Sequence, residues 1–276
     1  MVYFAGIDMS TTRQALSERT FAACIAQNGK KMELFALFPL RDDAELMGFL
    51  CEGTYALCGI DAPLSLPPCA SCCDLGCGCS FPSWAAELGE PWEVFYHYRL
   101  CDILLRRTVP PLSPKPALSN GGPVDITPLS LRWLRLSRAL ATHPCRPMAR
   151  VIEVYASGTA HLLAKKFALP SSTRPTLRTS AALRARYLSW CVSVLPLHIP
   201  PALGVLMVEH QDAFDAVLAA ISAVFAGQGR VLQPRMLLGL TPAPAYVKPL
   251  QHLSLATREE MAHHLASQNW PMLPNL

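Results

Sequence analysis

The stretch Val2-Tyr-Phe-Ala-Gly-Ile-Asp8 is an apolar run that ends in an acidic residue. Short runs of this kind, rich in β-branched and aromatic side chains, are typical of buried strands. Two more apolar runs follow at residues 21–26 and 31–37, and Asn28-Gly29 between them is a strong hairpin signal. The start of the chain therefore predicts three antiparallel strands.

A second apolar run that ends in an acid, Tyr55-Ala-Leu-Cys-Gly-Ile-Asp61, predicts a fourth strand. A short strand is expected over residues 150–155. An amphipathic helix is expected over residues 209–225, where apolar side chains recur at helical spacing before Gly227. Further helices are expected over residues 42–51, 94–107, 127–141 and 258–267. This order predicts an α/β fold, in which antiparallel strands and then parallel strands form one mixed sheet flanked by helices.

The composition agrees with a folded globular chain. Of its 276 residues, 51% are hydrophobic and 16% are charged, against about 25% charged in an average protein. This composition excludes a disordered chain, a collagen-like repeat and a coiled coil. No apolar run approaches the roughly 20 residues of a membrane span, and the start lacks the pattern of a signal peptide. We therefore expect a cytoplasmic protein with no membrane partner, and its oligomeric state stays open.

The expected organisation is one domain over residues 1–230 with an insert and an extension. The insert, at about residues 67–92, is rich in Pro and Cys and shows neither helical nor strand periodicity. The extension over residues 231–276 is expected to be peripheral.

A cysteine cluster marks the insert, with the pattern C-x2-C-C-x3-C-x-C at Cys69, Cys72, Cys73, Cys77 and Cys79. In a reducing compartment, clustered cysteines favour metal ligation over disulfides. We expect zinc to be held by four of them, because four thiolates would anchor a loop that has no core. The expected zinc ligands are Cys69, Cys72, Cys77 and Cys79. An iron–sulfur cluster and a set of free thiols are the alternatives, and Cys51 and Cys145 carry no signal of their own.

Five acidic residues stand out by their position. Asp8 and Asp61 each close an apolar strand, and Glu153 lies inside a short one. Asp212 and Asp215 open the amphipathic helix on a face other than its apolar stripe. If these carboxylates converge, they form an oxygen-ligand site suited to Mg²⁺ or Mn²⁺. Alternatively, the strand acids begin turns and the helix acids complement the positive end of the helix.

The charge is unevenly distributed along the chain. Residues 126–208 contain 11 basic residues and one acid, so this segment carries +10 whereas the whole chain carries +4. Such a face attracts phosphates, which favours nucleic acid as a partner. The candidates for binding substrate phosphates are Arg99, Arg106, Arg132 and Arg135, with Arg138 on the same helix face as the last two. Pairing with acids such as Asp102 is the equally open alternative.

Several short motifs occur together in a characteristic order. They are Gly6-Ile7-Asp8, Ile60-Asp61-Ala62-Pro63-Leu64, Arg99 with Asp102 and Arg106, Val151-Ile152-Glu153-Val154-Tyr155, and His210-Gln-Asp212-Ala-Phe-Asp215-Ala216. In this order they resemble the family called domain of unknown function 429, over about residues 3–226. That family is described as predicted nucleases of ribonuclease H-like fold.

The resemblance implies a set of metal ligands. It implies that the first strand holds Asp8, that the fourth holds Asp61, and that the last helix brings Asp212 or Asp215 beside them. Of the two helix acids, Asp215 fits slightly better. Glu153 fits the family's own motif, and its role as a ligand is less certain.

The resulting hypothesis is a metal-dependent nuclease that cleaves phosphodiester bonds in DNA or RNA, with these carboxylates as metal ligands. The first alternative is an ATP-dependent phosphotransferase of the actin-like superfamily, suggested by Ser10-Thr11-Thr12 after the first strand. A second Gly-rich phosphate loop is missing, which speaks against it. The second alternative is a scaffold that binds nucleic acid or protein without turnover. DNA, RNA and small phosphate esters stay open as substrates, as do internal and terminal cleavage.

Overall fold

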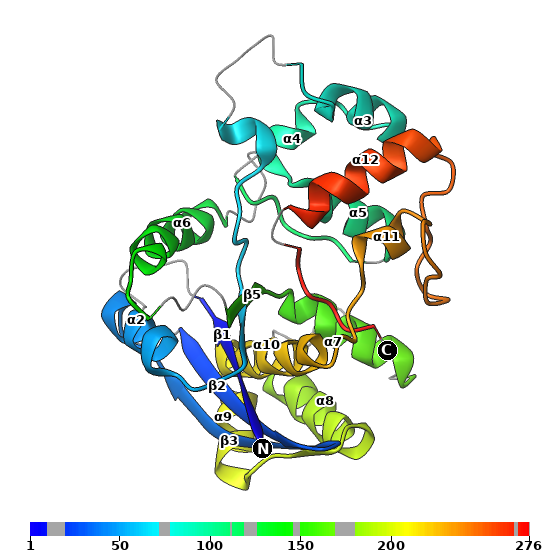
Figure 1. Cartoon of the computed structure of the whole chain (residues 1–276). Helices are drawn as coiled ribbons and strands as arrows, with labels where there is room; N and C mark the ends of the chain where they lie inside the picture. The colour runs from blue at the N-terminus through cyan, green and yellow to red at the C-terminus, as the bar shows by residue number, and fades with distance from the viewer. Residues whose placement is uncertain are drawn as a thin grey trace. The chain divides into compact units, whose positions relative to one another are not determined.

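The computed structural model describes residues 1–9, 20–71, 78–110, 112–118, 126–145, 150–168, 180–267 and 270–275 (Figure 1). Ser10-Thr11-Thr12, Cys72, Cys73 and Cys77 lie outside the described residues, so the predictions that involve them stay predictions. The chain packs as two compact units. The first unit comprises Met1–Ala62, Arg135–Val231 and Pro271–Leu276, and the second comprises Pro63–Leu134 and Leu232–Trp270.

The two units do not follow the boundary predicted from the sequence between a domain and a C-terminal extension. The division into a domain over 1–230 and an extension over 231–276 stays a prediction about independent folding. In the packing, most of residues 231–276 go with residues 63–134.

The first unit is built on a mixed sheet with the strand order β5-β4-β1-β2-β3-β6. Strands β1, β2 and β3 pair antiparallel, whereas β4 pairs parallel with β1, β5 with β4, and β6 with β3. The expected α/β fold with antiparallel strands followed by parallel ones is thereby confirmed. The strands are β1 (Val2–Asp8), β2 (Phe21–Asn28), β3 (Lys31–Pro39), β4 (Leu57–Asp61), β5 (Val151–Glu153) and β6 (Leu197–His198).

The hairpin between β2 and β3 forms where the sequence predicted it. Asn28 pairs with Lys31, which leaves a two-residue turn that begins with Gly29. Gly29 has a φ of 60°, in the left-handed region that a residue without a Cβ adopts at no steric cost.

Helix α10 (Gln211–Gly227) is the central helix of the first unit, and it packs against β1 and β4. Phe214, Val217 and Ile221 of this helix are at most 2% exposed and join side chains of β1, β2 and β3 in one core. The other helices of this unit are α2 (Asp43–Glu52), α7 (Ala156–Lys166), α8 (Ala181–Val194) and α9 (Pro201–Glu209). Helix α6 (Thr127–Ala141) contributes its residues from Arg135 onward.

The second unit is helical. The helix expected over residues 94–107 is interrupted, because Tyr98 is extended with φ −110° and ψ 143° and Arg99 caps a new helix. The insert, expected to lack helical periodicity, contains a helix between Ser80 and Gly89 whose apolar face buries Trp84. The elements are the 3₁₀ helix η1 (Pro68–Ser71), α3 (Phe81–Leu88), α4 (Val94–His97), α5 (Leu100–Thr108), α11 (Pro234–Leu237) and α12 (Leu255–Ala266).

The C-terminal segment is part of the packed structure, so the expectation of a peripheral tail was wrong. Thr257 at the start of α12 donates to Glu87 of α3 over 2.6 Å. Trp270 is 6% exposed, and its indole Nε1 donates to the carbonyl of Leu232 over 2.9 Å. No local pattern in the sequence indicated these contacts, because each joins residues far apart in the chain. Among the described residues, no helix has the length and apolar character needed to cross a membrane.

Candidate functional site

Asp8 and Asp61 lie side by side at the ends of neighbouring parallel strands. Asp8 of β1 is the register partner of Asp61 of β4. Register partners lie about 4.8 Å apart and point to the same face of a sheet. Both side chains are half-buried. The tertiary structure therefore brings together two carboxylates that are far apart in the sequence.

Helix α10 covers the same face. Gly6 lies two residues before Asp8, and a Cβ on Gly6 would come within 2.1 Å of the Ala220 backbone nitrogen and 2.3 Å of the Ala216 carbonyl oxygen. Gly59 of β4 allows the same close approach, since a Cβ there would lie 2.6 Å from the Ala219 carbonyl oxygen. The two glycines therefore seat α10 directly on the strands that end in acids.

The direction of α10 brings its first turns to the acidic ends of the strands. Gly227 at its end packs against the ring of Phe4, and Ala216 approaches Gly6. The helix thus runs antiparallel to β1, and its first turns lie toward Asp8. These turns carry Asp212, which is half-buried, and Asp215, which is 2% exposed.

Asp61 is held in place by a backbone hydrogen bond. The N–H of Ala156, the first residue of α7, donates to Asp61 Oδ1 over 3.1 Å. The N-terminus of a helix carries a partial positive charge, which stabilises a carboxylate placed there. This bond fixes the orientation of the Asp61 side chain, and by itself it also gives Asp61 a structural role as a helix cap.

Glu153 is placed differently. It is the register partner of Ile60, which pairs with Ile7. Since neighbouring residues of a strand point to opposite faces, Glu153 faces away from the side of Asp8 and Asp61. It is 4% exposed. The structure therefore does not bring Glu153 into the group of Asp8, Asp61 and the helix acids.

The donor chemistry of this carboxylate group fits Mg²⁺ or Mn²⁺. Among the described residues, no three carboxylates have ligand oxygens within 4.8 Å of one another. A preformed all-carboxylate cage is not required, because Mg²⁺ keeps several waters and commonly binds one or two carboxylates together with substrate phosphates. The Asp8 and Asp61 pair supplies that number of hard oxygen donors.

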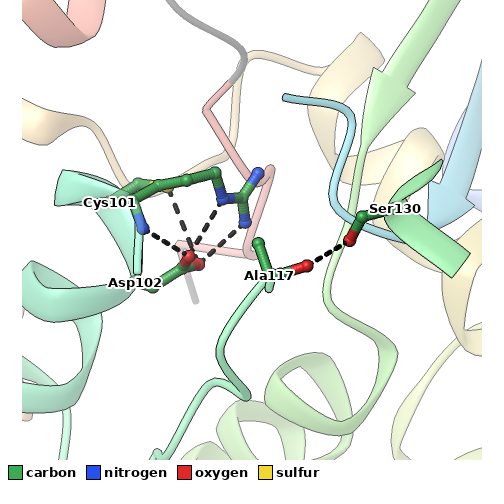
Figure 2. A network of polar contacts seen from close by, with 5 residues as sticks. Cys101, Asp102, Ala117 and Ser130 are labelled. Atoms are coloured by element: carbon green, nitrogen blue, oxygen red, sulfur yellow. Dashed lines mark hydrogen bonds and ion pairs between the residues drawn. The ribbon is translucent and has the colours of Figure 1, made fainter. Parts of the chain in front are cut away.

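Arg99 and Asp102 form a buried ion pair in the second unit. Arg99 Nη2 lies 2.8 Å from Asp102 Oδ1, Nε lies 2.9 Å from Oδ2, and the side chains are 4% and 3% exposed. Figure 2 shows Cys101 Sγ donating to Asp102 over 3.7 Å, and Ser130 donating to the Ala117 carbonyl over 2.7 Å. The Arg99 guanidinium, paired with Asp102 at the start of α5, caps that helix and is not presented to a phosphate.

The other candidate arginines have varied surroundings. Arg106 lies 2.8 Å from Glu90 and over the ring of Tyr98, and Arg135 pairs with Asp43. Arg132 is half-buried, whereas Arg138 on the same helix is exposed. The pairing that the sequence left open as an alternative therefore occurs for Arg99, Arg106 and Arg135.

Two further residues of the basic segment serve the structure. Arg184 is 6% exposed, and its guanidinium donates to the carbonyls of Val208 and Glu209, just before α10. Arg150 donates to the Gly53 carbonyl over 2.6 Å at the end of α2. The net charge of the segment thus overstates the number of cations available to a ligand.

Of the cysteines expected to hold zinc, the structure describes two. Cys69 is 8% exposed, and Cys79 is half-buried. Because Cys72 and Cys77 lie outside the described residues, zinc at this loop stays a prediction.

A group that sequence reasoning missed lies in the first unit. Cys51, His143 and Cys145 place their ligand atoms within 4.8 Å of one another. His143-Pro-Cys145 was the local signal available in the sequence. The third member is 92 residues from His143, so no spacing rule pointed to it.

Comparison with curated proteins and with solved structures gave no match. A family model described as "Protein of unknown function (DUF429)" matches residues 6–236, a range that runs from β1 to α11 and includes all five of the acids considered above. The chain therefore belongs to the DUF429 family of proteins of unknown function.

Proposed function

We propose that this protein is a divalent-metal-dependent hydrolase of phosphodiester bonds in DNA or RNA, with Asp8 and Asp61 at the centre of its metal site. The observation that carries the proposal is the register pairing of these two acids on the face covered by α10. Two carboxylates held next to each other repel, and a divalent cation relieves that repulsion.

Each residue of the group has a distinct role in the proposal. Asp8 and Asp61 are the ligands, and the bond from the Ala156 N–H keeps the Asp61 carboxylate oriented. Asp215 is the helix acid that completes the group, since it is buried in the turn of α10 that precedes the contact with Gly6. When bound, Mg²⁺ or Mn²⁺ supplies Lewis-acid stabilisation of the phosphate oxygens and activation of a water.

The arrangement of the sheet supports a ribonuclease H-like fold as the finer assignment. Antiparallel β1, β2 and β3, parallel β4, and a late helix seated on the acid-bearing strands are the features that the family resemblance implies. A nucleic acid is the proposed substrate, and Arg138, Lys166 and Arg186 are exposed cations of the first unit that could contact its phosphates.

The test compares metal binding and cleavage in matched variants. We expect the double variant Asp8→Asn and Asp61→Asn to weaken Mn²⁺ binding, measured by calorimetry, by more than about 100-fold. Loss of an outer partner alone typically costs roughly 10–100-fold in metal affinity. Cleavage of labelled single-stranded and double-stranded DNA, RNA and a small phosphodiester should fall to background. The proposed helix ligand is tested by comparing Asp215→Asn with Asp212→Asn.

The control is Glu33→Gln, which removes an exposed carboxylate from β3 of the same sheet. Unchanged Mn²⁺ affinity and unchanged cleavage in the Asp8/Asp61 double variant would contradict the proposal. Metal binding without cleavage of any of these substrates would reject the hydrolase and leave a metal-binding scaffold.

A further inference from the structure

The group formed by Cys51, His143 and Cys145 has the composition and spacing of a transition-metal site. Cys51 Sγ lies 3.3 Å from His143 Nδ1, which lies 3.0 Å from Cys145 Sγ. Zinc binds thiolate sulfur at about 2.3 Å and imidazole nitrogen at about 2.0–2.1 Å in a tetrahedron. Those bond lengths put sulfur and nitrogen roughly 3.5 Å apart. Both sulfur–nitrogen distances are therefore within about half an ångström of the separation that a bound ion requires.

The orientation of the imidazole suits metal binding. Nδ1 of His143 faces both sulfur atoms, and the backbone N–H of Cys145 points at the same nitrogen over 3.4 Å. A nitrogen that receives an N–H carries the lone pair, so the ring proton resides on Nε2. A neutral imidazole with its lone pair toward the site is the form that ligates metal ions.

Two helix ends favour a cation at this place. Cys51 lies in the last turn of α2, and His143 follows α6 by two residues. The C-terminal end of a helix carries a partial negative charge, which attracts a positive ion. The guanidinium of Arg150 donates to the carbonyls of Leu50 and Gly53, on either side of Cys51.

The group also lies where the C-terminal ends of two helices come together. Arg135 in the middle of α6 pairs with Asp43 at the start of α2, and the three-residue group lies at the C-terminal ends of the same two helices. An ion bound there would add a second link between α6 and α2.

From these observations we propose that Cys51, His143 and Cys145 form a zinc site, whose ligands are neither the carboxylates of β1 and β4 nor the cysteines of the 69–79 loop. Thiolate and imidazole ligands favour zinc over Mg²⁺ and Mn²⁺, which prefer oxygen ligands. Cys145 is exposed, so water has access to the fourth tetrahedral position. The bound ion stabilises the folded first unit because the unfolded chain does not hold the three ligands together.

The experiment measures metal content in the full chain under reducing conditions. The protein is loaded with Zn²⁺, dialysed and analysed for bound metal, and Co²⁺ is used in parallel for its thiolate-to-cobalt charge-transfer absorption. Variants are made in two backgrounds, the natural sequence and a loop variant in which Cys69, Cys72, Cys77 and Cys79 are all serine. The loop background separates this site from any metal held by the insert.

We expect Cys145→Ser and His143→Ala each to remove one equivalent of zinc in both backgrounds, and the loop variant alone to retain one equivalent. Cys145 is exposed and His143 half-buried, so both variants should fold, which circular dichroism checks. The matched control is Cys24→Ala, which removes a thiol of β2 and should leave the metal content unchanged. Zinc should also raise the melting temperature of the loop variant, and Cys145→Ser should abolish that rise.

Two results would overturn the proposal. One is an equal zinc content in the loop variant with and without Cys145→Ser. The other is a disulfide between Cys51 and Cys145, found by mass spectrometry in protein purified and loaded under reducing conditions.

Discussion

At the scale of single residues, the buried Arg99 and Asp102 pair shows how context decides the role of a charge. Both side chains are nearly inaccessible, and Nε and Nη2 of Arg99 donate to the two carboxylate oxygens of Asp102. Such a pair contributes little compared with apolar residues of the same volume, but removal of one partner leaves an uncompensated buried charge. The pair therefore holds α5 in place, whereas sequence reasoning had offered Arg99 as a phosphate ligand.

We predict that Asp102→Ala lowers the free energy of unfolding by about 3–5 kcal/mol, because it leaves the Arg99 guanidinium buried without its carboxylate. Urea denaturation followed by circular dichroism measures the change. The control is Glu259→Ala, which breaks the pair with Arg235, where both side chains are 49% exposed. That variant should cost about 0–1 kcal/mol, and an equal loss in the two variants would show that burial is not the cause.

His264 gives the second unit a dependence on pH. Its ring packs on Phe81 and Trp84, and burial, together with the neighbouring charge of His263, lowers the pKa of His264 below its ordinary value of 6.5. Below about pH 6.5 the unfolded chain therefore binds more protons at this position than the folded one. Stability is then lost as the pH falls through 6.5, and above that pH His264 has no effect.

We predict that His264→Phe, which keeps a ring between Phe81 and Trp84, reduces the loss of stability between pH 7.5 and pH 5. Melting temperatures recorded across this range provide the measurement. The control is His252→Gln, at an exposed position, which should leave the pH profile unchanged. If the profile of His264→Phe followed that of the natural sequence, another group would be responsible.

At the scale of elements, the contact between α10 and the sheet depends on glycine. Gly6 and Gly59 present no Cβ on the face where α10 lies, so the backbone of the helix rests directly on β1 and β4. This close approach also sets the distance between the acids of the strands and those of the helix. The sequence identified these strands as apolar runs, but it did not show that their glycines serve helix packing.

We predict that Gly6→Ala destabilises the protein by about 3 kcal/mol or more, at the upper end of the cost of overpacking, because the new methyl group would meet helix backbone that cannot rotate away. It should also weaken Mn²⁺ binding, since displacement of α10 separates Asp215 from Asp8. Denaturation and calorimetry measure the two effects. Gly48→Ala in α2 is the control, because a Cβ there has nothing within 4 Å and should stabilise the helix by about 0.5–1 kcal/mol. Two variants of equal stability would contradict the close-packing argument.

At the scale of the whole molecule, local periodicity was enough to find most elements of the first unit. Alternation and apolar runs identified β1 to β4, and helical spacing identified α10 within two residues of its observed bounds. The second unit was harder to predict. The helix α3 is short and bounded by Ser80 and Gly89, and the break at Tyr98 falls inside an apolar pattern that looked continuous.

The sequence by itself determined the mixed sheet, the acids at strand ends and the membership of the DUF429 family. Each of these can be recognised from residues that are close together in the chain or from motifs that follow in a fixed order. Only the tertiary structure decided that Asp8 meets Asp61 while Glu153 faces the other way, and that Cys51 meets His143 from 92 residues away. Strand register and helix packing determine these contacts. Register and packing depend on how the whole chain buries its apolar surface, and no local pattern of residues encodes that burial.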